Sequence, residues 1–271
     1  MTENSIKKQT IKKLDQQIKS LENGTNSWGN RFLSTGIKEL DQLLPGSWLR
    51  CGTLVEWYET DKGSGALTMA LQIARSVCGT EGTLVMIDPD QELYPLAMSL
   101  LGIDLARTIF IHPETPLQTL WALEQSLRCP GVTVTICLLS DLNSQTFRRL
   151  QLAAEKGGTL AMILRSDRFE KSPSWSETRL CITPVPSPCN YFKKPDYLTG
   201  LPSHTHRRIQ IKLLRTLQGI RSSILELDIN DKTGAVHVVS KLADTTSLSE
   251  PLTTEPQNTH RITGLSGNPA R

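Results

Sequence analysis

The sequence predicts an α/β protein with a doubly wound, mostly parallel sheet and flanking helices. Apolar runs alternate with segments of helical periodicity between residues 31 and 183, an order that produces parallel strands joined by helices. The apolar runs are continuous, as expected for strands buried between two helix layers. A glycine-containing turn joins the first of these strands to a helix. The 271 residues are enough to bury such a core.

A short helix from Ile37 to Leu44 is expected to open this core, with Ser34 or Thr35 as its N-cap. Strands and helices then follow each other in regular order. The expected strands cover 52–57, 82–88, 107–112, 132–139 and 159–164. The expected helices cover 66–78, 93–103, 116–128 and 144–156.

Residues 1–30 are expected to form an N-terminal helix and a linker. Between residues 4 and 22, apolar side chains repeat at spacings of three and four, which predicts an amphipathic helix with a narrow apolar stripe. The stripe consists of Ile11, Leu14, Ile18 and Leu21. Two roles are open for this helix: a cap on its own domain, or a docking helix for a neighbouring subunit or another protein.

The chain after residue 183 is expected to be less regular. Five prolines within 184–205 predict a linker. Residues 206–243 are expected to form a small antiparallel β extension, with alternating polar and apolar side chains in its first strand. Residues 244–271 are rich in Ser, Thr and Pro, and a disordered tail is predicted there.

Composition and charge fit a cytoplasmic protein. The 30 Lys and Arg and the 27 Asp and Glu give a net charge of +3, which neither requires nor excludes nucleic acid. None of the six cysteines forms a C-x-x-C pair, and the five histidines do not cluster with them, so buried thiols are expected instead of a metal site or disulfides. No signal peptide is recognised, and no apolar stretch approaches the ~18 residues of a membrane span.

The turn after the first strand has the layout of a phosphate-binding P-loop. Residues 56–71 read EWYETDKGSGALTMAL, whereas the P-loop pattern requires Gly-x-x-x-x-Gly-Lys-[Ser/Thr]. The loop positions are occupied by Thr60, Gly63, Ser64, Gly65, Ala66 and Leu67. The two glycines and the serine are able to form a nest of backbone N–H groups. Ala66, however, replaces the lysine, and Leu67 replaces the magnesium-binding hydroxyl.

Loss of the lysine and the hydroxyl removes two contacts on which phosphoryl transfer depends. Lys62 is expected to be a solvated loop lysine, and Thr68 lies one position beyond the usual magnesium ligand. Asp141, which follows the strand at 132–139, is favoured as a capping or turn residue. The sequence therefore predicts no ATP hydrolysis, no cofactor and no metal.

Several motifs resemble the bacterial recombinase RecA and, more closely, the RecA-like ImuA family. The RecA opening Ser-Thr-Gly-x-x-x-Leu-Asp is matched by residues 34–41, and its Leu-Gly-Ile-Asp stretch by residues 101–104. The segments WALEQSLRCPGV (121–132) and FRRLQLAAEKGG (147–158) resemble the two most recognisable ImuA blocks. The resemblance covers about residues 30 to 183 and implies a RecA-like core of the P-loop NTPase type.

The resemblance also has implications for chemistry and partners. The catalytic glutamate of RecA falls on Asp90 and its adenine-stacking tyrosine on Ala97, so water activation and adenine recognition are both impaired. Resemblance to ImuA implies a non-catalytic accessory protein in SOS damage-induced mutagenesis and translesion DNA synthesis. It would bind ImuB, a Y-family polymerase-like protein, and assist an error-prone C-family DNA polymerase. The N-terminal helix would contact RecA or a second copy of this chain.

Two other functions are open. One is a RecA- or KaiC-like ATP-binding protein with an atypical P-loop, in which Lys62, Thr68 and Asp90 serve as reserve ligands. The other is a single-stranded DNA-binding module without hydrolysis. Its candidate phosphate contacts are Arg148, Arg149, Arg165 and Arg168. A basic strand would add Arg207, Arg208, Lys212 and Arg215. Ordinary surface charge is the alternative role of all these residues.

Overall fold

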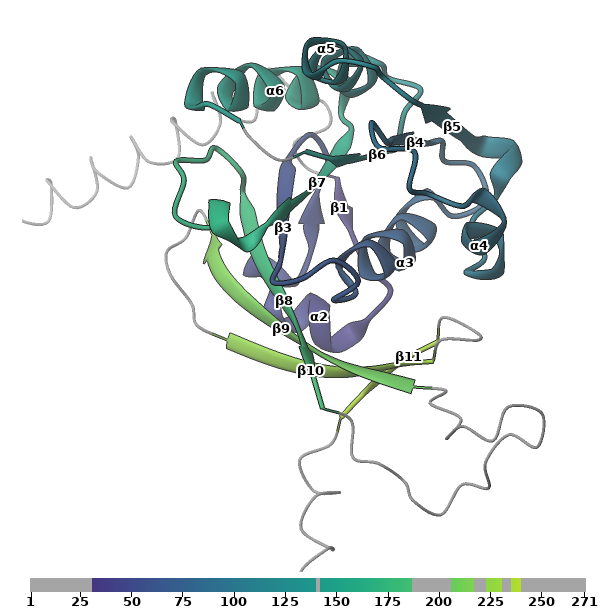
Figure 1. The fold of residues 1–271 in the computed structure, drawn as a ribbon, viewed down its shortest axis with the longest axis vertical. Helices are drawn as coiled ribbons and strands as arrows, with labels where there is room; N and C mark the ends of the chain where they lie inside the picture. The colour runs from purple at the N-terminus through teal and green to yellow at the C-terminus, as the bar shows by residue number, and fades with distance from the viewer. Residues whose placement is uncertain (1–30, 140–141, 187–205, 217–222, 231–234, 240–271) are drawn as a thin grey trace, which may run out of the picture. The chain divides into compact units, whose positions relative to one another are not determined.

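The computed structural model describes residues 31–239, apart from 140–141, 187–205, 217–222 and 231–234. Its main feature is a nine-stranded sheet with the order β11-β10-β9-β8-β3-β7-β6-β4-β5 (Figure 1). The parallel strands are β3 (Leu54–Glu59), β4 (Leu84–Ile87), β5 (Thr108–Ile111), β6 (Val134–Leu138), β7 (Leu160–Ser166) and β8 (Thr178–Val185). The predicted doubly wound, mostly parallel sheet is confirmed.

Antiparallel strands extend this sheet beyond β8. They are β9 (His206–Thr216), β10 (Ser223–Asn230) and β11 (Val236–Val238). β9 pairs with β8 from Thr178, opposite Thr216, to Val185, opposite Arg208. The predicted antiparallel strands are therefore present, and they continue the core sheet.

Helices cover both faces of the parallel half. The first face carries α2 (Lys38–Leu43), α3 (Ala66–Cys78) and α4 (Pro95–Leu100). The second face carries α5 (Pro116–Arg128) and α6 (Ser144–Gly157). Because side chains alternate along a strand, β3 sends Val55 and Trp57 into the first core and Leu54 into the second. The two helix layers predicted from the continuous apolar strands are thus present.

The ends of α3 and α5 coincide with the predicted residues. α5 begins with a capping box, in which the Thr115 hydroxyl accepts a hydrogen bond from the backbone N–H of Gln118 and the Gln118 side chain accepts one from the backbone N–H of Thr115. α3 begins after Gly65, which has a left-handed backbone conformation. Local sequence signals were therefore sufficient to locate these two helices.

The N-cap predicted for the first helix is wrong. The N-cap of α2 is Ile37, and its side chain forms no capping hydrogen bond. Ser34 instead donates from its hydroxyl to Asp41 Oδ2 (2.6 Å), and the backbone N–H of Thr35 donates to Asp41 Oδ1 (2.8 Å). The Asp41 carboxylate, inside the helix, thus binds the preceding turn. Ser34 and Thr35 stabilise this turn and do not cap the helix.

The helix expected at 93–103 is shorter than predicted. α4 ends at Leu100, and Gly102 follows with φ 82°. A Cβ atom at Gly102 would lie 2.8 Å from the Arg75 guanidinium carbon, so the chain turns tightly against α3 there. Short 3-10 helices occur at Pro45–Ser47, Leu105–Arg107 and Asp167–Phe169.

A separate two-stranded sheet pairs β1 (Phe32–Leu33) with β2 (Leu49–Arg50). The predicted N-terminal helix, with Ile11, Leu14, Ile18 and Leu21, lies outside the described residues, as do Asp141 and the predicted tail from 244. The linker predicted at 184–205 begins later, because β8 continues to Val185. Among the described residues, no helix has both the length and the hydropathy to cross a lipid bilayer.

We predict that Gly157→Ala destabilises the protein, although alanine is the better helix former. A Cβ atom at Gly157 would overlap the Leu127 carbonyl oxygen of α5 and come within 2.8 Å of the Arg128 carbonyl carbon. Overpacking of this kind costs about 1–3 kcal/mol, which exceeds the gain in helix propensity of about 1 kcal/mol. Urea unfolding of this variant and of Gly131→Ala, where a Cβ atom would make only an ordinary contact with Cys129 Sγ at 3.9 Å, would measure the difference. Equal midpoints for the two variants would contradict the close packing of α5 on α6.

Candidate functional site

The loop between β3 and α3 keeps the strand–turn–helix geometry expected for a phosphate loop. Gly63 and Gly65 have φ angles of 86° and 107°, in the left-handed region that favours glycine. The backbone N–H of Ser64 donates to the Asp61 carbonyl oxygen (3.1 Å), which closes the turn. Ala66 is the first residue of α3 and is buried, while Leu67 is half-buried against the first core. The lysine and hydroxyl positions are therefore occupied by apolar groups.

Strand β9 packs against this loop. Arg207 donates from Nη1 to the Gly63 carbonyl oxygen (3.2 Å) and from Nη2 to the Thr68 hydroxyl (2.8 Å). A Cβ atom at Gly65 would lie 3.1 Å from Ile209 Cγ2, which shows how closely the strand approaches. The Thr68 hydroxyl, a candidate reserve ligand for magnesium, is thus already bound by a guanidinium. The sequence placed Arg207 on a basic strand but gave no indication of this contact.

Lys62 is paired with an acidic residue from another loop. Its Nζ lies 2.6 Å from Glu92 Oε1, and its side chain is 79% exposed. The hydrogen bond and the charge of Glu92 raise the pKa of Lys62. The expectation of a solvated lysine agrees with this exposure, while the ion pair was not foreseen. Burial raises the pKa of nearby Glu59, and the Ser64 hydroxyl and the Lys62 charge oppose that rise.

The loop after β4 is organised by Asp88. Its Oδ2 accepts a hydrogen bond from the Leu93 N–H (2.8 Å), and its carbonyl oxygen lies 3.0 Å from His112 Nδ1. Asp88 is fully buried. Asp90 and Ala97, the positions matched to the catalytic glutamate and the adenine-stacking tyrosine of RecA, are both exposed. Ala97 lies on α4 and has no ring to stack on a base.

Arg165 does not lie on the surface, which corrects its assignment as a candidate DNA contact. Its side chain has 0% exposure, and its Nη1 lies 2.6 Å from Glu56 Oε1 inside the protein. The guanidinium also lies over the rings of Tyr58, Phe147 and Phe169. A guanidinium that is buried and paired with a carboxylate cannot reach a phosphate in this conformation. The sequence did contain a signal of a buried ion pair, because Glu56 is a charged residue inside the apolar run of β3.

Glu56 is the centre of a buried polar cluster. Besides Arg165, its carboxylate is contacted by Arg179 Nε at 3.2 Å and accepts a hydrogen bond from the Tyr58 hydroxyl (2.8 Å). The Ser176 hydroxyl donates to Oε2 (2.6 Å), and the Ser174 hydroxyl donates to the same oxygen. Burial and the Glu56 charge raise the pKa of Tyr58 to about 12, against a lowering by Arg179. The phenol therefore stays protonated and able to donate at neutral pH.

The other candidate arginines have different surroundings. Arg149 Nε lies 3.0 Å from Glu124 Oε2, and the same carboxylate binds Arg128 at 2.6 Å. Arg148 lies over the Trp175 ring, 5.0 Å from its centroid, and Arg168 lies over Phe169 at 4.7 Å. The four arginines therefore do not form one continuous basic track. Arg148 and Arg168 are exposed, and Arg149 is exposed but compensated by Glu124.

Polar residues on β10 pair with one cation and one amide of the basic strand β9. Arg208 forms a two-point contact with Asp228, at 2.9 Å and 3.1 Å. Gln210 donates to Glu226 (3.3 Å) in the next cross-strand pair. Lys212 and Arg215 remain exposed. The face that the sequence offered as a DNA contact is thus largely a set of cross-strand pairs.

One edge of the large sheet combines unpaired backbone with exposed apolar side chains. β5 pairs with β4 alone among the described strands, and Ile109 on it is 50% exposed. α4 and α5 lie on either side of this edge (Figure 1). We call the following set the β5 edge surface: Tyr94, Leu96, Leu100, Ile109, Leu117 and Trp121. The sequence placed these residues in their elements, but it gave no indication that they are exposed there.

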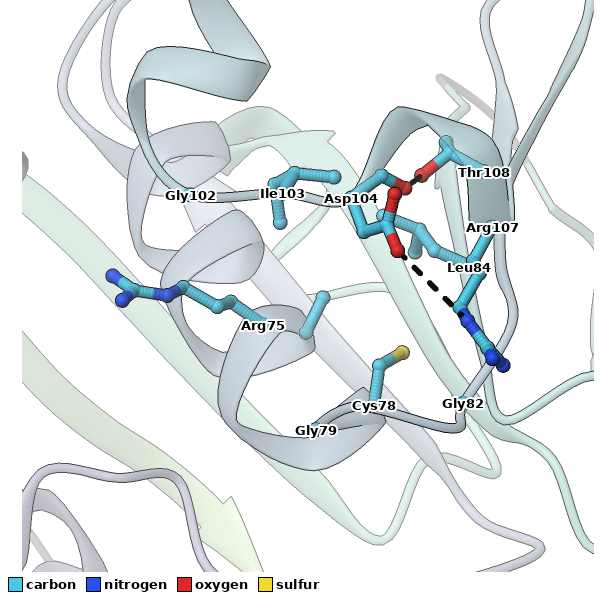
Figure 2. A pocket seen from close by; sticks show the side chains of 11 residues that line it. Arg75, Cys78, Gly79, Gly82, Leu84, Gly102, Ile103, Asp104, Arg107 and Thr108 are labelled. Carbon is cyan, nitrogen blue, oxygen red and sulfur yellow. Dashed lines mark hydrogen bonds and ion pairs between the residues drawn. The ribbon is translucent and has the colours of Figure 1, made fainter.

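A small pocket of about 50 Å³ lies between the end of α3 and the starts of β4 and β5. Figure 2 shows Arg75 and Arg107 on opposite sides of Cys78. Arg107 is already paired with Glu81 (3.3 Å) and Asp104 (3.8 Å). Burial raises the pKa of Cys78 to about 11, so its thiol is protonated and a poor nucleophile at neutral pH. Among the described residues, no group of His, Cys, Asp and Glu could hold a metal ion.

The comparisons with known proteins point to one superfamily. No family model matches the chain. RecA of Crocosphaera subtropica is 29% identical over 127 residues, which are 47% of this chain but only 35% of that protein, about a third of its length. ImuA of Caulobacter vibrioides is 27% identical over 172 residues, covering 57% of this chain and 69% of that protein. The crystal structure of the RadB recombinase matches 77% of this chain and 100% of its own, with a TM-score of 0.56 and 17% identity, which shows a shared fold.

We predict that Glu56→Gln lowers the free energy of unfolding by about 3–5 kcal/mol, because Arg165 and Arg179 would keep buried charges without a carboxylate. Glu92→Gln, which removes a solvent-exposed pair with Lys62, is expected to leave the midpoint of urea unfolding unchanged. If the two substitutions shifted the midpoint equally, the buried cluster would have no special role in stability.

Proposed function

We propose that this ImuA-like protein of the RecA/P-loop superfamily is a non-catalytic accessory protein of damage-induced mutagenesis and translesion DNA synthesis. The assignment to mutagenesis rests on its similarity to ImuA of Caulobacter vibrioides. The proposed partners are ImuB, a Y-family polymerase-like protein, and through it an error-prone C-family DNA polymerase. The proposed location is the cytoplasm, where such partners act on DNA.

The β5 edge surface is the observation that carries the role in protein contacts. An edge strand presents backbone N–H and C=O groups that another chain is able to pair with. Leu117 and Trp121, one helical turn apart on α5, are 77% and 65% exposed. Leu96 and Leu100 have the same spacing on α4 and are 56% and 70% exposed. Large apolar side chains are thus exposed on both helices beside the edge strand, which supports a protein partner here.

The phosphate loop supports the absence of catalysis. A P-loop places a lysine on the β- and γ-phosphates and a hydroxyl on magnesium, but this chain has Ala66 and Leu67 at those positions. Arg207 binds the Gly63 carbonyl and the Thr68 hydroxyl, so the neighbouring strand holds the loop in place without a ligand. We therefore propose that the loop is structural, and that the protein hydrolyses no ATP and carries no cofactor.

The N-terminal stripe of Ile11, Leu14, Ile18 and Leu21 is proposed as a second contact, with RecA or with another copy of this chain.

The ATP-binding alternative is disfavoured by the engagement of Lys62 with Glu92 and of Thr68 with Arg207. The DNA-binding alternative keeps Arg148 and Arg168 as exposed cations. Any DNA contact is proposed to be weak or indirect.

We predict that ATP with magnesium does not stabilise the protein. A ligand at one hundred times its dissociation constant would stabilise the folded state by about 2.7 kcal/mol and raise the melting temperature measurably. No such shift is expected at millimolar ATP, and no phosphate release above background. Arg207→Ala removes the guanidinium that contacts the loop, and so tests whether that contact alone prevents ATP binding. We expect this variant to remain unresponsive to ATP, because the loop still lacks the lysine and the magnesium-binding hydroxyl. A magnesium-dependent, saturable shift in either protein would overturn the proposal.

We predict that Trp121→Glu weakens binding to a purified ImuB-type polymerase at least about tenfold, because it places a charge in the centre of an apolar contact. Trp48→Ala is the matched control, since Trp48 is a similarly exposed tryptophan outside this surface, at 47%. Surface plasmon resonance with the full-length proteins would measure both. A chain without residues 1–22 tests the N-terminal stripe separately. Undiminished binding by Trp121→Glu would exclude the β5 edge surface as the contact.

A further inference from the structure

The buried cluster around Glu56 has no part in the function proposed above, and its geometry points to a separate role. Its charged members come from three adjacent strands: Glu56 from β3, Arg165 from β7 and Arg179 from β8. Placing three charges inside a protein is unfavourable unless each is paired and hydrogen-bonded. An apolar group of similar size would fill the same space at a lower desolvation cost. The arrangement therefore calls for an explanation beyond stability.

What the cluster does is hold one loop, residues 166–177, onto the end of the sheet. Arg179 Nη2 donates to three carbonyl oxygens of this loop, those of Phe169 (3.5 Å), Glu170 (2.6 Å) and Ser172 (3.3 Å). Further along, the hydroxyls of Ser174 and Ser176 both donate to Glu56 Oε2. From Asp167 onward the loop belongs to no strand, yet it is anchored by hydrogen bonds at five of its residues.

Trp175 lies between two of these anchors and is turned outward. Ser174 and Ser176 bind the buried carboxylate, while Trp175 is 49% exposed. Its orientation is set by two contacts with α6. The indole N–H donates to the Ser144 hydroxyl (3.2 Å), and the Arg148 guanidinium lies 5.0 Å from the ring centroid. A large aromatic side chain is thus held in one exposed position before any partner arrives.

The surroundings of Trp175 are apolar and positively charged. Ser144, Arg148 and Leu152 are four residues apart on α6 and lie along one row of that helix. Leu152 is 48% exposed. Arg168 and Lys171, on the anchored loop, are exposed as well. Among the described residues Arg148, Arg168 and Lys171 form no ion pair, whereas Arg149 and Arg165 are each bound to a glutamate. These three cations are therefore not neutralised by a direct ion pair, and their acidic neighbours along the chain are Asp167 and Glu170.

We propose that Trp175, Arg148 and Leu152, with Arg168 and Lys171 at the margin, form a docking site for an acidic peptide segment that carries a large apolar side chain. We call these five residues the Trp175 surface. Tryptophan and arginine are the residue types that dominate protein-binding energy, and side chains held rigid in advance lose little entropy on binding. The cations supply the charge complementarity with an acidic segment.

A peptide fits this surface better than single-stranded DNA does. Stacking of a base requires an open aromatic face, and one face of Trp175 is covered by the Arg148 guanidinium. A phosphate track requires a row of cations, but Arg149 and Arg165, which would lengthen the row, are neutralised by Glu124 and Glu56. Exposed Leu152 offers an apolar contact for a side chain and none for a phosphate.

The experiment uses the full chain and a fluorescein-labelled peptide of fifteen residues, composed of Glu, Asp and Ser with one central Leu-Trp pair. Two further probes are the same peptide with Ser-Ser at the centre and a fluorescent oligo(dT) of fifteen nucleotides. Fluorescence anisotropy is measured at low and at physiological salt. The Leu-Trp peptide is expected to bind, to weaken as salt rises, and to bind at least about tenfold more tightly than the Ser-Ser peptide.

Trp175→Ala and Arg148→Glu are each expected to weaken binding of the Leu-Trp peptide by about tenfold or more. The matched controls are Trp48→Ala and Trp121→Glu, which remove exposed tryptophans elsewhere and are expected to change the affinity less than about twofold. The Trp121→Glu control also separates this surface from the β5 edge surface, so that either proposal can fail while the other holds. All four side chains are exposed, which keeps the folded state intact.

Three results would overturn the proposal. The first is absence of binding by the Leu-Trp peptide to the wild-type protein at submillimolar concentration. The second is binding that is unchanged in Trp175→Ala or Arg148→Glu. The third is oligo(dT) binding that is tighter than peptide binding and is lost in the same two variants, because it would assign the surface to nucleic acid.

Discussion

The ion pair between Glu56 and Arg165, completed by Arg179, is the interaction on which the centre of the fold depends. It joins β3 to the two parallel strands that flank it, β7 and β8, and β8 is the last parallel strand before the antiparallel extension. Each charge is stable inside the protein only because it is paired with an opposite charge. The three strands must therefore pair in the register that brings these side chains together. The loop from 166 to 177 then follows, because its carbonyls and hydroxyls complete the hydrogen bonds of the cluster.

The pairing of β9 with β8, which continues the sheet, is the second interaction that shapes the structure, because it determines what packs on the loop after β3. Because β9 pairs with β8, it brings Arg207 and Ile209 against the loop between β3 and α3. A loop of this shape usually gains its order from a bound phosphate and its cation. Here a guanidinium from the neighbouring strand binds the loop carbonyl and the Thr68 hydroxyl. The same strand order leaves β5 at the opposite edge without a described partner, and the proposed protein contacts lie there.

Sequence reasoning was accurate where the signal is local. The helix predicted at 116–128 matches α5 to the residue, and in the structure α5 begins with a capping box of Thr115 and Gln118 beside a proline. It was wrong about Ser34 and Thr35, because both are good caps but a more favourable partner, Asp41, lies within reach. Arg165 was misassigned for a related reason, since an arginine at the end of an apolar strand gives no indication of a carboxylate that lies 109 residues away.

The sequence by itself determined the alternation of strands and helices, the two-layer burial of the sheet and the unusual composition of the phosphate loop. These features depend on periodicity and on residue types within a few positions of each other. Only the tertiary structure decided which arginines are buried, that β9 packs on the loop, and that β5 forms an edge of the sheet. The reason is physical: ion pairing and strand pairing join groups that are distant along the chain, and their energies depend on a burial that exists only after folding.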